Sequence, residues 1–475
     1  MKKEARNKYL IKNTAIFAIG NFATKFISFF LIPLYTNVLT TTEYGIVDLL
    51  YTLCSVLMPL LTLNICEAVL RFAMDKDADT AKIMSIGNLL IIISAVLGLI
   101  SIPILNSIEA YSEYSSYFYL YLVTLGMSQI FLCNLKGQEK LIDYSVGNFI
   151  HTLAIAIFNI LFLVVFEMGI KGYFLAYTIS NIVTALYAFI RGKVILSIKN
   201  FKFDKKLFIE MTKYSVLLIP NSFMWWIMNS SDRVMVANFL GESANGIYAI
   251  SYKLPTLLTT ITTVFTHAWI YSAVNENESE DKEEYTNYVF KKLVAIIFLL
   301  SSGMMMIIKP FLSIYVTKEY FSAWQYTPFL FIGFTFLTLA SFLSSSYNVN
   351  KDSKGFLFSG MGGAVVNIVF NFILIPIIGI SGAAIATCLS YIAVFVYRII
   401  DTKKYVKINI FYKEFFLAVL LIITQAACLF INNMFGQCLL IIEFLLILLL
   451  FKNTWLPMLK TILNKIKSRW NNDLW

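Results

Sequence analysis

Long apolar runs, separated by short polar loops, recur along the whole chain. A helix needs about 20 apolar residues to cross roughly 30 Å of hydrocarbon, because it rises only about 1.5 Å per residue. Counting runs of that length in the 475-residue sequence predicts fourteen membrane-spanning helices. The predicted spans are residues 13–38, 44–70, 84–105, 116–135, 145–167, 173–192, 214–239, 244–271, 293–316, 326–348, 355–379, 381–399, 412–431 and 438–451. We therefore predict an all-α polytopic membrane protein.

The overall composition agrees with a membrane-embedded chain. Hydrophobic residues make up 59% of the sequence and charged residues only 14%, which is more apolar surface than a soluble core could bury. The formal net charge of +10 would suggest nucleic acid as a partner of a soluble protein. Here the lysines cluster at the ends of apolar runs, where anionic lipid and the positive-inside rule account for them. We expect membrane lipids as partners, and no nucleic acid.

The distribution of basic residues orients the predicted spans. The first apolar run continues to Leu39, longer than the core of a signal peptide, so we interpret it as an uncleaved first span. With both termini in the cytoplasm, 32 of the 38 Lys and Arg residues fall on the cytoplasmic side and three on the outer side. This asymmetry favours that orientation in a bacterial plasma membrane. The remaining three lie within spans: Lys25, Arg233 and Lys253.

Cysteine and histidine usage suggests no metal site. The six cysteines lie in or beside apolar runs without paired spacing, which implies neither a disulfide framework nor a zinc site. His151 and His267 are isolated, and we expect each to be a packed helix residue rather than a ligand or a proton relay.

Two pairs of segments suggest that the chain contains an internal repeat. Residues 39–53 align with 240–254 at an offset of 201, and residues 168–180 align with 378–390 at an offset of 210. The two alignments occur in the same order, and each half begins in the cytoplasm. Parallel repeats of this kind usually enclose a central cavity.

The repeat divides the chain into three parts. We predict an N-terminal lobe over residues 1–198, with six helices, and a C-terminal lobe over residues 199–408, with six more. Residues 409–475 add two helices and a basic cytoplasmic tail. The basic segment 191–213, near the middle, is either an interfacial helix that joins the lobes or a solvated loop.

Four stretches of the sequence resemble a known transporter family. They are NTAIFAIGNFATKFISFFLIPLYTNVLTTTEYGIVDL, LLIPNSF, SSDRVMVANFLGESANGIYAISYKL and NIVFNFILIPIIGISGAAIATCLS. Together they resemble the polysaccharide and oligosaccharide-lipid flippases of the multidrug/oligosaccharidyl-lipid/polysaccharide exporter superfamily. The resemblance covers the twelve-helix repeat.

This resemblance implies a transporter that alternates between inward-open and outward-open states. Its expected substrate is a polyprenyl-pyrophosphate-linked oligosaccharide repeat unit of the O-antigen or capsule type, moved from the inner to the outer leaflet. A polysaccharide polymerase and glycosyltransferases are then expected partners. Related branches of the superfamily flip lipid II or export cationic drugs, and both alternatives stay open.

Two lysines lie near the middle of predicted spans. Lys25 is twelve residues into the first span and shares a helical face with Asn21, while Lys253 is about nine residues into the eighth span. An anionic pyrophosphate needs cationic or polar surroundings to cross hydrocarbon. We predict that Lys25, Lys253 and Asn21 line the substrate cavity, with a structural ion pair as the alternative for each lysine.

The seventh predicted span carries a polar stripe. Asn229 and Asp232 share this stripe, Arg233 follows directly, and Trp225 lies one turn earlier. Adjacent helix residues point about 100° apart, so Asp232 and Arg233 need separate partners. We predict a gating role for Asp232 and a cavity role for Arg233 and Asn229, with snorkelling as the alternative for Arg233. Trp225 either stacks on a sugar ring or packs in the lobe.

Other ionisable residues are candidates for ion coupling. Asp48 either takes part in proton or sodium coupling or pairs with a basic neighbour. Glu67 and Arg71 are spaced i, i+4, which favours a local ion pair over a gating role. Glu443 lies outside the repeat and faces lipid, a partner or another helix. Apart from possible coupling to H⁺ or Na⁺, no cofactor is expected.

Two competing functions make different demands on the sequence. A drug antiporter of this architecture would present acidic groups in its cavity, whereas the basic residues within the spans favour an anionic cargo. A membrane glycosyltransferase or polymerase would need a carboxylate cluster for a metal or a sizeable extramembrane domain. The sequence contains neither feature, so we expect a transporter rather than an enzyme.

Overall fold

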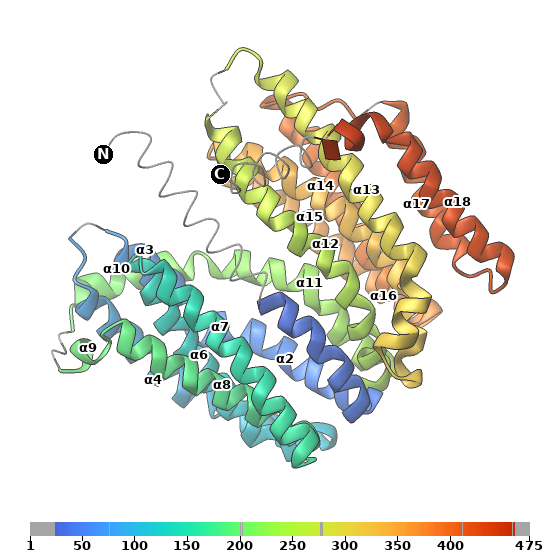
Figure 1. Ribbon diagram of the computed structural model, residues 1–475. Helices are drawn as coiled ribbons and strands as arrows, with labels where there is room; N and C mark the ends of the chain where they lie inside the picture. Colours follow the sequence, from blue (N-terminus) through green and yellow to red (C-terminus); the bar gives the residue numbers. More distant parts are fainter. Residues whose placement is uncertain are drawn as a thin grey trace, which may run out of the picture. The chain divides into compact units, whose positions relative to one another are not determined.

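The computed structural model describes residues 24–75, 77–199, 201, 203–275, 279–410, 412–457 and 459–460, and within them every regular element is a helix (Figure 1). The long helices are α2 (Thr41–Leu61), α4 (Thr80–Gly98), α6 (Ser115–Gly137), α7 (Leu141–Asn159), α8 (Gly169–Arg191), α11 (Ile219–Leu240), α12 (Glu242–Asn275), α13 (Lys282–Tyr315), α14 (Thr327–Val349), α15 (Ser353–Ile378), α16 (Ile380–Asp401), α17 (Lys413–Cys428) and α18 (Met434–Leu450). Shorter ones are α3 (Ile65–Ala73), α5 (Ser101–Asn106), α9 (Ile195–Lys199) and α10 (Lys205–Val216).

The predicted fold class is confirmed. Each of the fourteen predicted spans coincides with helical residues, in the first span from Thr24 onward. Of the helical stretches in the described ranges, nine meet the length and hydropathy needed to cross a bilayer. The chain is therefore an all-α, multi-pass membrane protein.

The second predicted span is not one helix. Residues 44–70 form α2 and α3, with a break where Leu63 and Asn64 take left-handed backbone angles (φ 51° and 53°). The Asn64 backbone N–H donates to the carbonyl oxygen of Pro59 (2.8 Å) and closes the end of α2. Asparagine tolerates left-handed angles better than most residues. Hydropathy alone cannot detect this break, because the residues on both sides are apolar.

The basic segment in the middle of the chain is largely helical. It forms α9 and α10 rather than a solvated loop, and α10 packs against α3. Asp204 caps α10 by accepting from the backbone N–H groups of Lys206 and Leu207 (3.1 Å each). Met211 of this helix is fully buried, as is Ser215 one turn later. The helix is therefore attached to the first part of the molecule by its apolar face.

The chain forms two compact units. The first comprises the described residues up to Trp226 together with Leu240–Ile247, and the second comprises Ile227–Phe239 and the described residues from Tyr248 onward. Both α11 and α12 thus contribute to each unit, whereas the sequence-based division began the second lobe at residue 199. The helices of residues 409–475 belong to the second unit.

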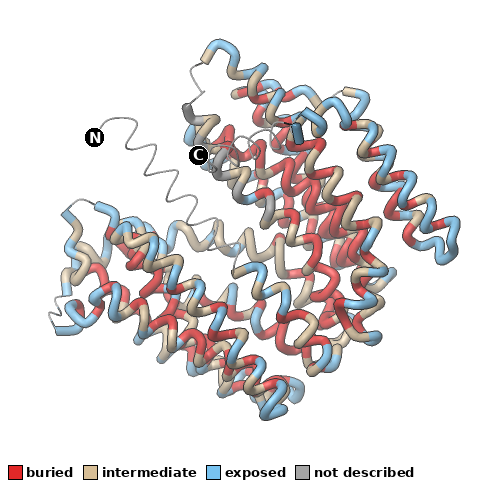
Figure 2. Tube along the Cα trace, in the orientation of Figure 1, coloured by how far each residue is buried: buried red, intermediate tan, exposed pale blue. Residues whose placement is uncertain are grey.

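The second unit is built around one buried helix. In α14, 19 of the 23 residues are buried, whereas α15 and α18 have largely exposed apolar faces (Figure 2). A helix that is apolar all round either lies in a core or faces lipid. The packing assigns α14 to the first class, a distinction that is absent from its composition.

The first unit has its own core, which includes an unexpected disulfide. Ile65, Leu135 and their apolar neighbours form a buried cluster where α3, α4, α6 and α8 meet. A disulfide joins Cys66 of α3 to Cys133 of α6, with a Cα–Cα distance of 5.9 Å. The expectation of no disulfide was wrong, because the two cysteines are 67 residues apart in sequence and meet only when α3 packs on α6.

One of the two histidines is placed in this unit. His151 Nε2 lies 3.0 Å from Asn181 Oδ1, so its ring is a packed helix residue. The side chain of His267 is outside the described part.

The repeated segments meet at two glycines. A Cβ on Gly45 would overlap the carbonyl of Glu242, and a Cβ on Gly246 would overlap the carbonyl of Thr41. The Thr41 and Ser243 hydroxyls lie 2.8 Å apart. The equivalent residues Gly45 and Gly246 thus allow the first turns of α2 and α12 to cross backbone to backbone.

Candidate functional site

The polar stripe of α11 leads to a buried carboxylate in the second unit. Asp232 is 0% exposed, and its Oδ2 accepts hydrogen bonds from Tyr248 Oη (2.5 Å), Tyr252 Oη (3.0 Å) and Thr387 Oγ1 (3.0 Å). Its Oδ1 accepts from the backbone N–H of Arg233 (2.9 Å). Three helices, α11, α12 and α16, therefore supply this one carboxylate with its hydrogen-bond donors.

The donors are positioned by helix geometry. Tyr248 and Tyr252 are four residues apart on α12, so their side chains lie on the same face one turn apart. Their rings meet edge to face at 5.3 Å. The guanidinium of Arg233 lies over the Tyr252 ring at 5.2 Å. Tyr252 thus contacts both residues, with its hydroxyl on the carboxylate of Asp232 and its ring face on the guanidinium of Arg233. The two charged side chains use different parts of the same tyrosine.

Amide and hydroxyl groups extend the site along α15. Asn367 Nδ2 donates to Thr387 Oγ1 (3.3 Å), and Asn367 Oδ1 accepts from Ser231 Oγ (3.3 Å) and Asn371 Nδ2 (2.9 Å). Both asparagines are fully buried, and Asn371 Oδ1 has no hydrogen-bond partner among the described residues. The site is thus rich in oxygen atoms, and one of its amide oxygens is available to a further ligand.

This arrangement suits a proton or an alkali cation. Carboxylate, amide and hydroxyl oxygens are the ligands that hard cations prefer. In the described part of the chain, no group of three or more His, Cys, Asp or Glu residues is placed to hold a metal ion. With one carboxylate, the Asp232 site is therefore better matched to a monovalent cation than to a divalent metal.

The equivalent region of the first unit has no such carboxylate. At an offset of 201, Leu31 corresponds to Asp232, and Leu31 is buried. Tyrosines of this unit pack against one another: Tyr173 stacks on Tyr177 at 4.5 Å and meets Tyr35 edge to face at 5.3 Å. Tyr121 contacts Tyr177 at 5.9 Å. The repeat therefore supports different chemistry in its two copies.

The predicted cavity residues are divided between the units. In the first unit, Lys25 is exposed and Trp225 is half-buried; in the second, Lys253 and Asn229 are half-buried. Asn229 Oδ1 accepts from the Tyr391 hydroxyl (3.0 Å). The exposure of the two lysines is compatible with contact to solvent or substrate and also with a structural contact.

Asn21 lies outside the described residues. The indole of Trp226, next to Trp225, donates to the carbonyl of Thr52 (3.0 Å). This bond attaches the middle of α11 to α2 within the first unit.

The remaining predicted residues belong to the first unit, whereas the Asp232 site belongs to the second. Asp48 is 6% exposed on α2, whereas Glu67 is exposed on α3. Arg71 pairs with Asp75 (2.6 Å), so the predicted partner Glu67 was wrong. Glu67 lies four residues before Arg71 and Asp75 four residues after it. Both spacings permit an ion pair on a helix, so the sequence alone could not choose between them.

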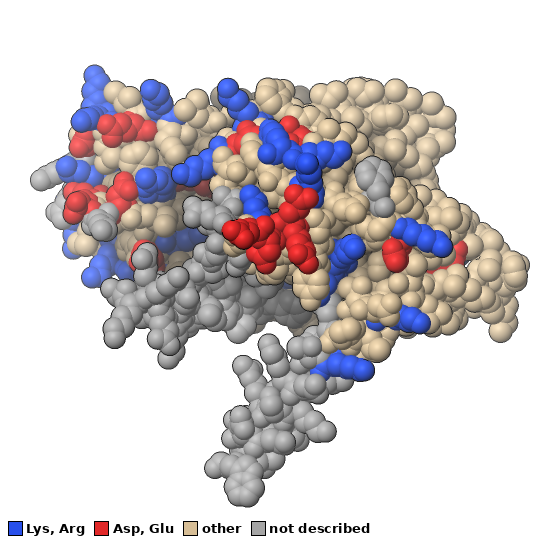
Figure 3. All heavy atoms as spheres, turned by 90° about the horizontal axis from the view of Figure 1, so that it is seen from above, with Lys and Arg blue, Asp and Glu red and all other residues tan. Residues whose placement is uncertain are grey.

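Charged side chains also gather at helix ends. Figure 3 shows a face on which Lys and Arg side chains lie beside those of Asp and Glu. In the first unit, Arg191 at the end of α8 pairs with Asp143 at the start of α7 (2.8 Å). These contacts tie the ends of neighbouring helices together.

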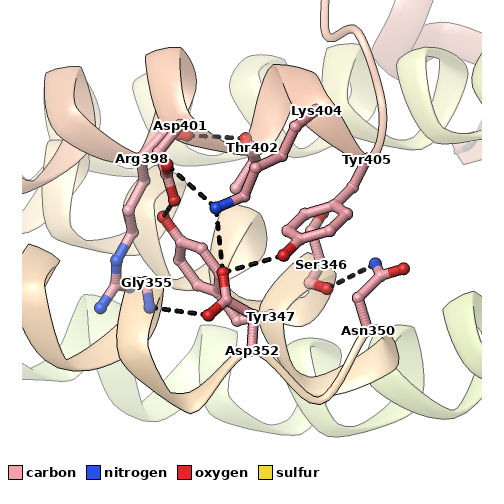
Figure 4. Close-up of polar contacts among 10 residues, drawn as sticks. All are labelled: Ser346, Tyr347, Asn350, Asp352, Gly355, Arg398, Asp401, Thr402, Lys404 and Tyr405. Atoms are coloured by element: carbon pink, nitrogen blue, oxygen red, sulfur yellow. Dashed lines mark hydrogen bonds and ion pairs between the residues drawn. The ribbon is translucent and has the colours of Figure 1, made fainter.

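The second unit has a denser network at the corresponding helix ends (Figure 4). Lys404 Nζ pairs with Asp352 Oδ2 (3.0 Å) and Asp401 Oδ1 (3.1 Å). Tyr347 Oη donates to Asp401 Oδ2 and Tyr405 Oη donates to Asp352 Oδ2, each at 2.8 Å. We call these five residues the clasp. Because every carboxylate in it is bonded, the clasp is a structural element rather than a binding site.

The local backbone stabilises the charge of Asp352. Its Oδ1 accepts from the backbone N–H of Gly355 (2.9 Å), and this bond, followed by Lys404 and Tyr405, lowers the pKa of Asp352 to about 2. Asp352 also occupies the N-cap of α15.

Arg398 is a buried cation beside the clasp. It lies near the end of a predicted span, on α16, and is only 2% exposed. Its Nε donates to Ser359 Oγ (3.0 Å) and its Nη1 to the carbonyl of Ala340 (2.8 Å). These bonds join α14, α15 and α16, so this arginine stabilises the packing of three helices.

Several residues of the site were missed at the sequence level. Tyr248, Thr387, Asn367 and Asn371 were not predicted as site residues, although the last two lie four apart in an otherwise apolar helix. A buried polar pair at that spacing was the available signal. The partner residues on other helices had no comparable signal.

Comparisons with known proteins agree with the membrane-transporter fold. A family model described as "Polysaccharide biosynthesis protein" matches residues 10–270. The probable lipid II flippase MurJ of Thermotoga maritima (strain ATCC 43589 / DSM 3109 / JCM 10099 / NBRC 100826 / MSB8) is 28% identical over 176 residues, which are 36% of this chain and 37% of that protein. The aligned part thus spans little more than a third of this relative.

Solved structures of two transporter types share the fold. A lipid II flippase MurJ in an inward closed conformation matches with a TM-score of 0.69 and 15% identity, covering 94% of this chain and 99% of that one. An inward-facing multidrug resistance MATE family transporter of the MOP superfamily matches with a TM-score of 0.64 and 15% identity, covering 82% and 97%.

Proposed function

Because this chain belongs to the polysaccharide biosynthesis protein family, whose model matches more than half of it, we propose that it is a flippase for a lipid-linked oligosaccharide. The substrate is a polyprenyl-pyrophosphate-linked repeat unit, which the protein moves from the inner to the outer leaflet of a bacterial plasma membrane by alternating access. The product serves surface polysaccharide biosynthesis. This is transport, and no bond of the substrate is made or broken.

The observation that carries the proposal is a lysine inside a predicted span in each unit, Lys25 in the first and Lys253 in the second. Lys25 is exposed on the first helix, and Lys253 is half-buried on α12. A cation far from a helix end is disfavoured in hydrocarbon unless it faces a polar partner or a water-filled path. A pyrophosphate is such a partner. Lysine binds a phosphate as a point charge on a flexible stem, which suits a substrate that must be released.

The Asp232 site offers a way to couple the transport cycle to a cation gradient. We infer that Asp232 binds H⁺ or Na⁺, with Thr387, Asn367 and Asn371 providing further oxygen atoms. A bound cation neutralises the negative charge of the buried carboxylate. The affinity of the site for the cation must therefore differ between conformations that bury Asp232 to different extents. Downhill movement of the cation would then drive the lipid-linked sugar across.

The lysine assignment is tested with single alanine variants in cells that depend on the protein for surface polysaccharide. We expect Lys25→Ala and Lys253→Ala to abolish export at normal protein abundance. Lys318→Ala is the matched control, because Lys318 is exposed and lies outside the membrane helices. Normal export by both variants at normal abundance would refute the cationic path.

The substrate class is tested by lipid analysis after deletion of the gene. A repeat-unit flippase predicts that the undecaprenyl-linked repeat unit accumulates on the cytoplasmic side, while lipid II is unaffected. The alternative favoured by the Thermotoga relative is lipid II itself, and it predicts the reverse pattern. Neighbouring genes for glycosyltransferases and a polymerase, the expected partners, would agree with the first outcome.

A further inference from the structure

The C-terminal helix pair carries a buried carboxyl that the proposed transport path does not use. Glu443 lies in α18, where it is the sole charged residue, and is 8% exposed. The pair α17–α18 packs against α13, so Glu443 faces other helices rather than lipid. Its Oε1 is 3.8 Å from the Cys428 thiol of α17. Its Oε2 has no hydrogen-bond partner among the described residues.

Two neutral polar groups with unused atoms lie at the same junction. Gln425 of α17 and Ser302 of α13 are both fully buried. Gln425 Nε2 donates to the carbonyls of Ser302 (3.2 Å) and Leu440 (3.3 Å). In the described part of the chain, Gln425 Oε1 and Ser302 Oγ have no hydrogen-bond partner.

Helical spacing brings these groups to one place. Gln425 lies three residues before Cys428 on α17, and Leu440 lies three residues before Glu443 on α18. Residues 425 and 428 share one face of α17, and residues 440 and 443 share one face of α18, so the contacts Gln425–Leu440 and Cys428–Glu443 lie within about one helical turn of each other on the two antiparallel helices. Three polar atoms that are buried without partners, from α13, α17 and α18, therefore belong to a single site.

Among the described residues, the charged and titratable groups near this site do not neutralise a carboxylate. On α17 the titratable neighbour is Cys428. On α13 the cation that reaches α17 is Lys309, two helical turns beyond Ser302. Its Nζ already donates to the carbonyl of Leu429 and to Asn432 Oδ1, and it lies over the Trp324 ring at 3.8 Å. An ionised Glu443 would thus be an unpaired charge in a membrane helix, which is strongly disfavoured.

We propose that Glu443 is a proton-binding site, occupied at neutral pH, at which the carboxylic acid hydrogen bonds with the unused oxygens of Gln425 and Ser302. The neutral acid adds a donor for Gln425 Oε1, which can only accept, while the Ser302 hydroxyl can both accept from the acid and donate to an oxygen. The proton is held more tightly when α17 and α18 are packed on α13 than when the junction opens to solvent. Raising the pH therefore weakens this packing, and lowering it strengthens the packing.

A protonated carboxyl and a charged one respond differently to the isosteric amide. Glu443→Gln copies the neutral acid, so we expect the full-length purified protein to keep its melting temperature and to lose the pH dependence contributed by this site. Infrared spectra of the wild type at neutral pH should contain the carbonyl band of a protonated carboxylic acid, and Glu443→Gln should lack it. Glu414→Gln is the control, because Glu414 is exposed at the start of α17.

A second variant keeps the test decisive if Glu443→Gln folds poorly. Gln425→Leu removes the acceptor, so we expect the carboxylic acid band to shift and deprotonation to occur at lower pH than in the wild type. Absence of a protonated carboxyl assignable to Glu443 at neutral pH would overturn the proposal. So would a Glu443-dependent rise in melting temperature with NaCl over choline chloride, since it would show a bound cation in place of the proton.

Discussion

The two units contain repeated segments but differ in the residue that each buries at one equivalent position. In the second unit, Asp232 accepts bonds from two tyrosines and a threonine. In the first unit the equivalent residue is Leu31, and Tyr177 occupies the position equivalent to Thr387. The two copies thus place their ionisable groups differently: a carboxylate occupies this position in the second unit, whereas in the first unit the position is apolar and the buried carboxylate is Asp48 on α2.

The parts that both units retain are conformational. Gly169 and Gly379, at equivalent positions, both have positive φ, of 54° and 63°. Before α7 and α15, Glu139 and Lys351 both take left-handed angles, of 57° and 56°. Turns that direct the chain between helices are therefore the same, while the side chains that face the lobe interior have diverged. The backbone turns and the side chains around the Asp232 position have therefore changed independently of each other between the two units.

The largest expected effect comes from removing the carboxylate. Asp232→Ala leaves three buried hydroxyl donors without their acceptor, and each unsatisfied group costs about 1–3 kcal/mol. We expect substrate flipping to fall to background, together with a lower melting temperature. Asp232→Asn keeps an acceptor but removes the charge, so it should retain the fold and lose only transport. Cation-dependent transport that persists in Asp232→Asn would contradict the assignment.

The converse change should damage the first unit. Leu31→Asp introduces a carboxylate at the equivalent position, where Val47 stands in place of the donor Tyr248. A charged Asp at the centre of a membrane helix costs about 2.5–3.5 kcal/mol on insertion scales, so we expect a clear loss of folded protein on size-exclusion chromatography. Leu31→Asn is the neutral control and should be milder. Equal behaviour of the two variants would show that size rather than charge matters here.

A smaller difference is expected between substitutions at the two equivalent tyrosines, Tyr252 and Tyr51. Tyr252→Phe removes one of the hydroxyl donors to Asp232, which costs about 0.5–1.5 kcal/mol. It should also shift the cation concentration at which transport is half-maximal. Tyr51→Phe, at the equivalent position of the first unit, should leave that concentration unchanged. A shift in Tyr51→Phe as large as in Tyr252→Phe would remove the contrast between the units.

The smallest expected effect is at the clasp and depends on pH. The pKa of Asp352 is lowered to about 2. The charged carboxylate therefore stabilises the fold in full at any pH above the usual pKa of an aspartate, and this contribution is lost as the pH falls toward about 2. Asp352→Asn should therefore melt slightly earlier than the wild type at neutral pH, with a difference that narrows on acidification. Thermal melts at several pH values measure this, and a gap that widens in acid would contradict it.

The sequence predicted the fold more fully than the site. Apolar runs located the helices, because bilayer thickness determines their length irrespective of their neighbours. The break at Leu63 and Asn64 escaped prediction, since it depends on backbone angles rather than on hydropathy. In the site, Asp232 was identified because an ionisable residue in an apolar run is rare. Its donors were not, since tyrosine and threonine occur throughout the chain.

The sequence by itself determined the membrane class, the helical segments, the repeat and the short list of ionisable residues within the spans. Each of these follows from composition or local order along the chain. Only the tertiary structure decided that Asp232 collects three hydroxyl groups from α12 and α16, that Arg71 pairs with Asp75, and that Cys66 joins Cys133. These outcomes depend on which helix faces pack together, and in a bilayer an apolar face that meets another helix has the same composition as one that meets lipid.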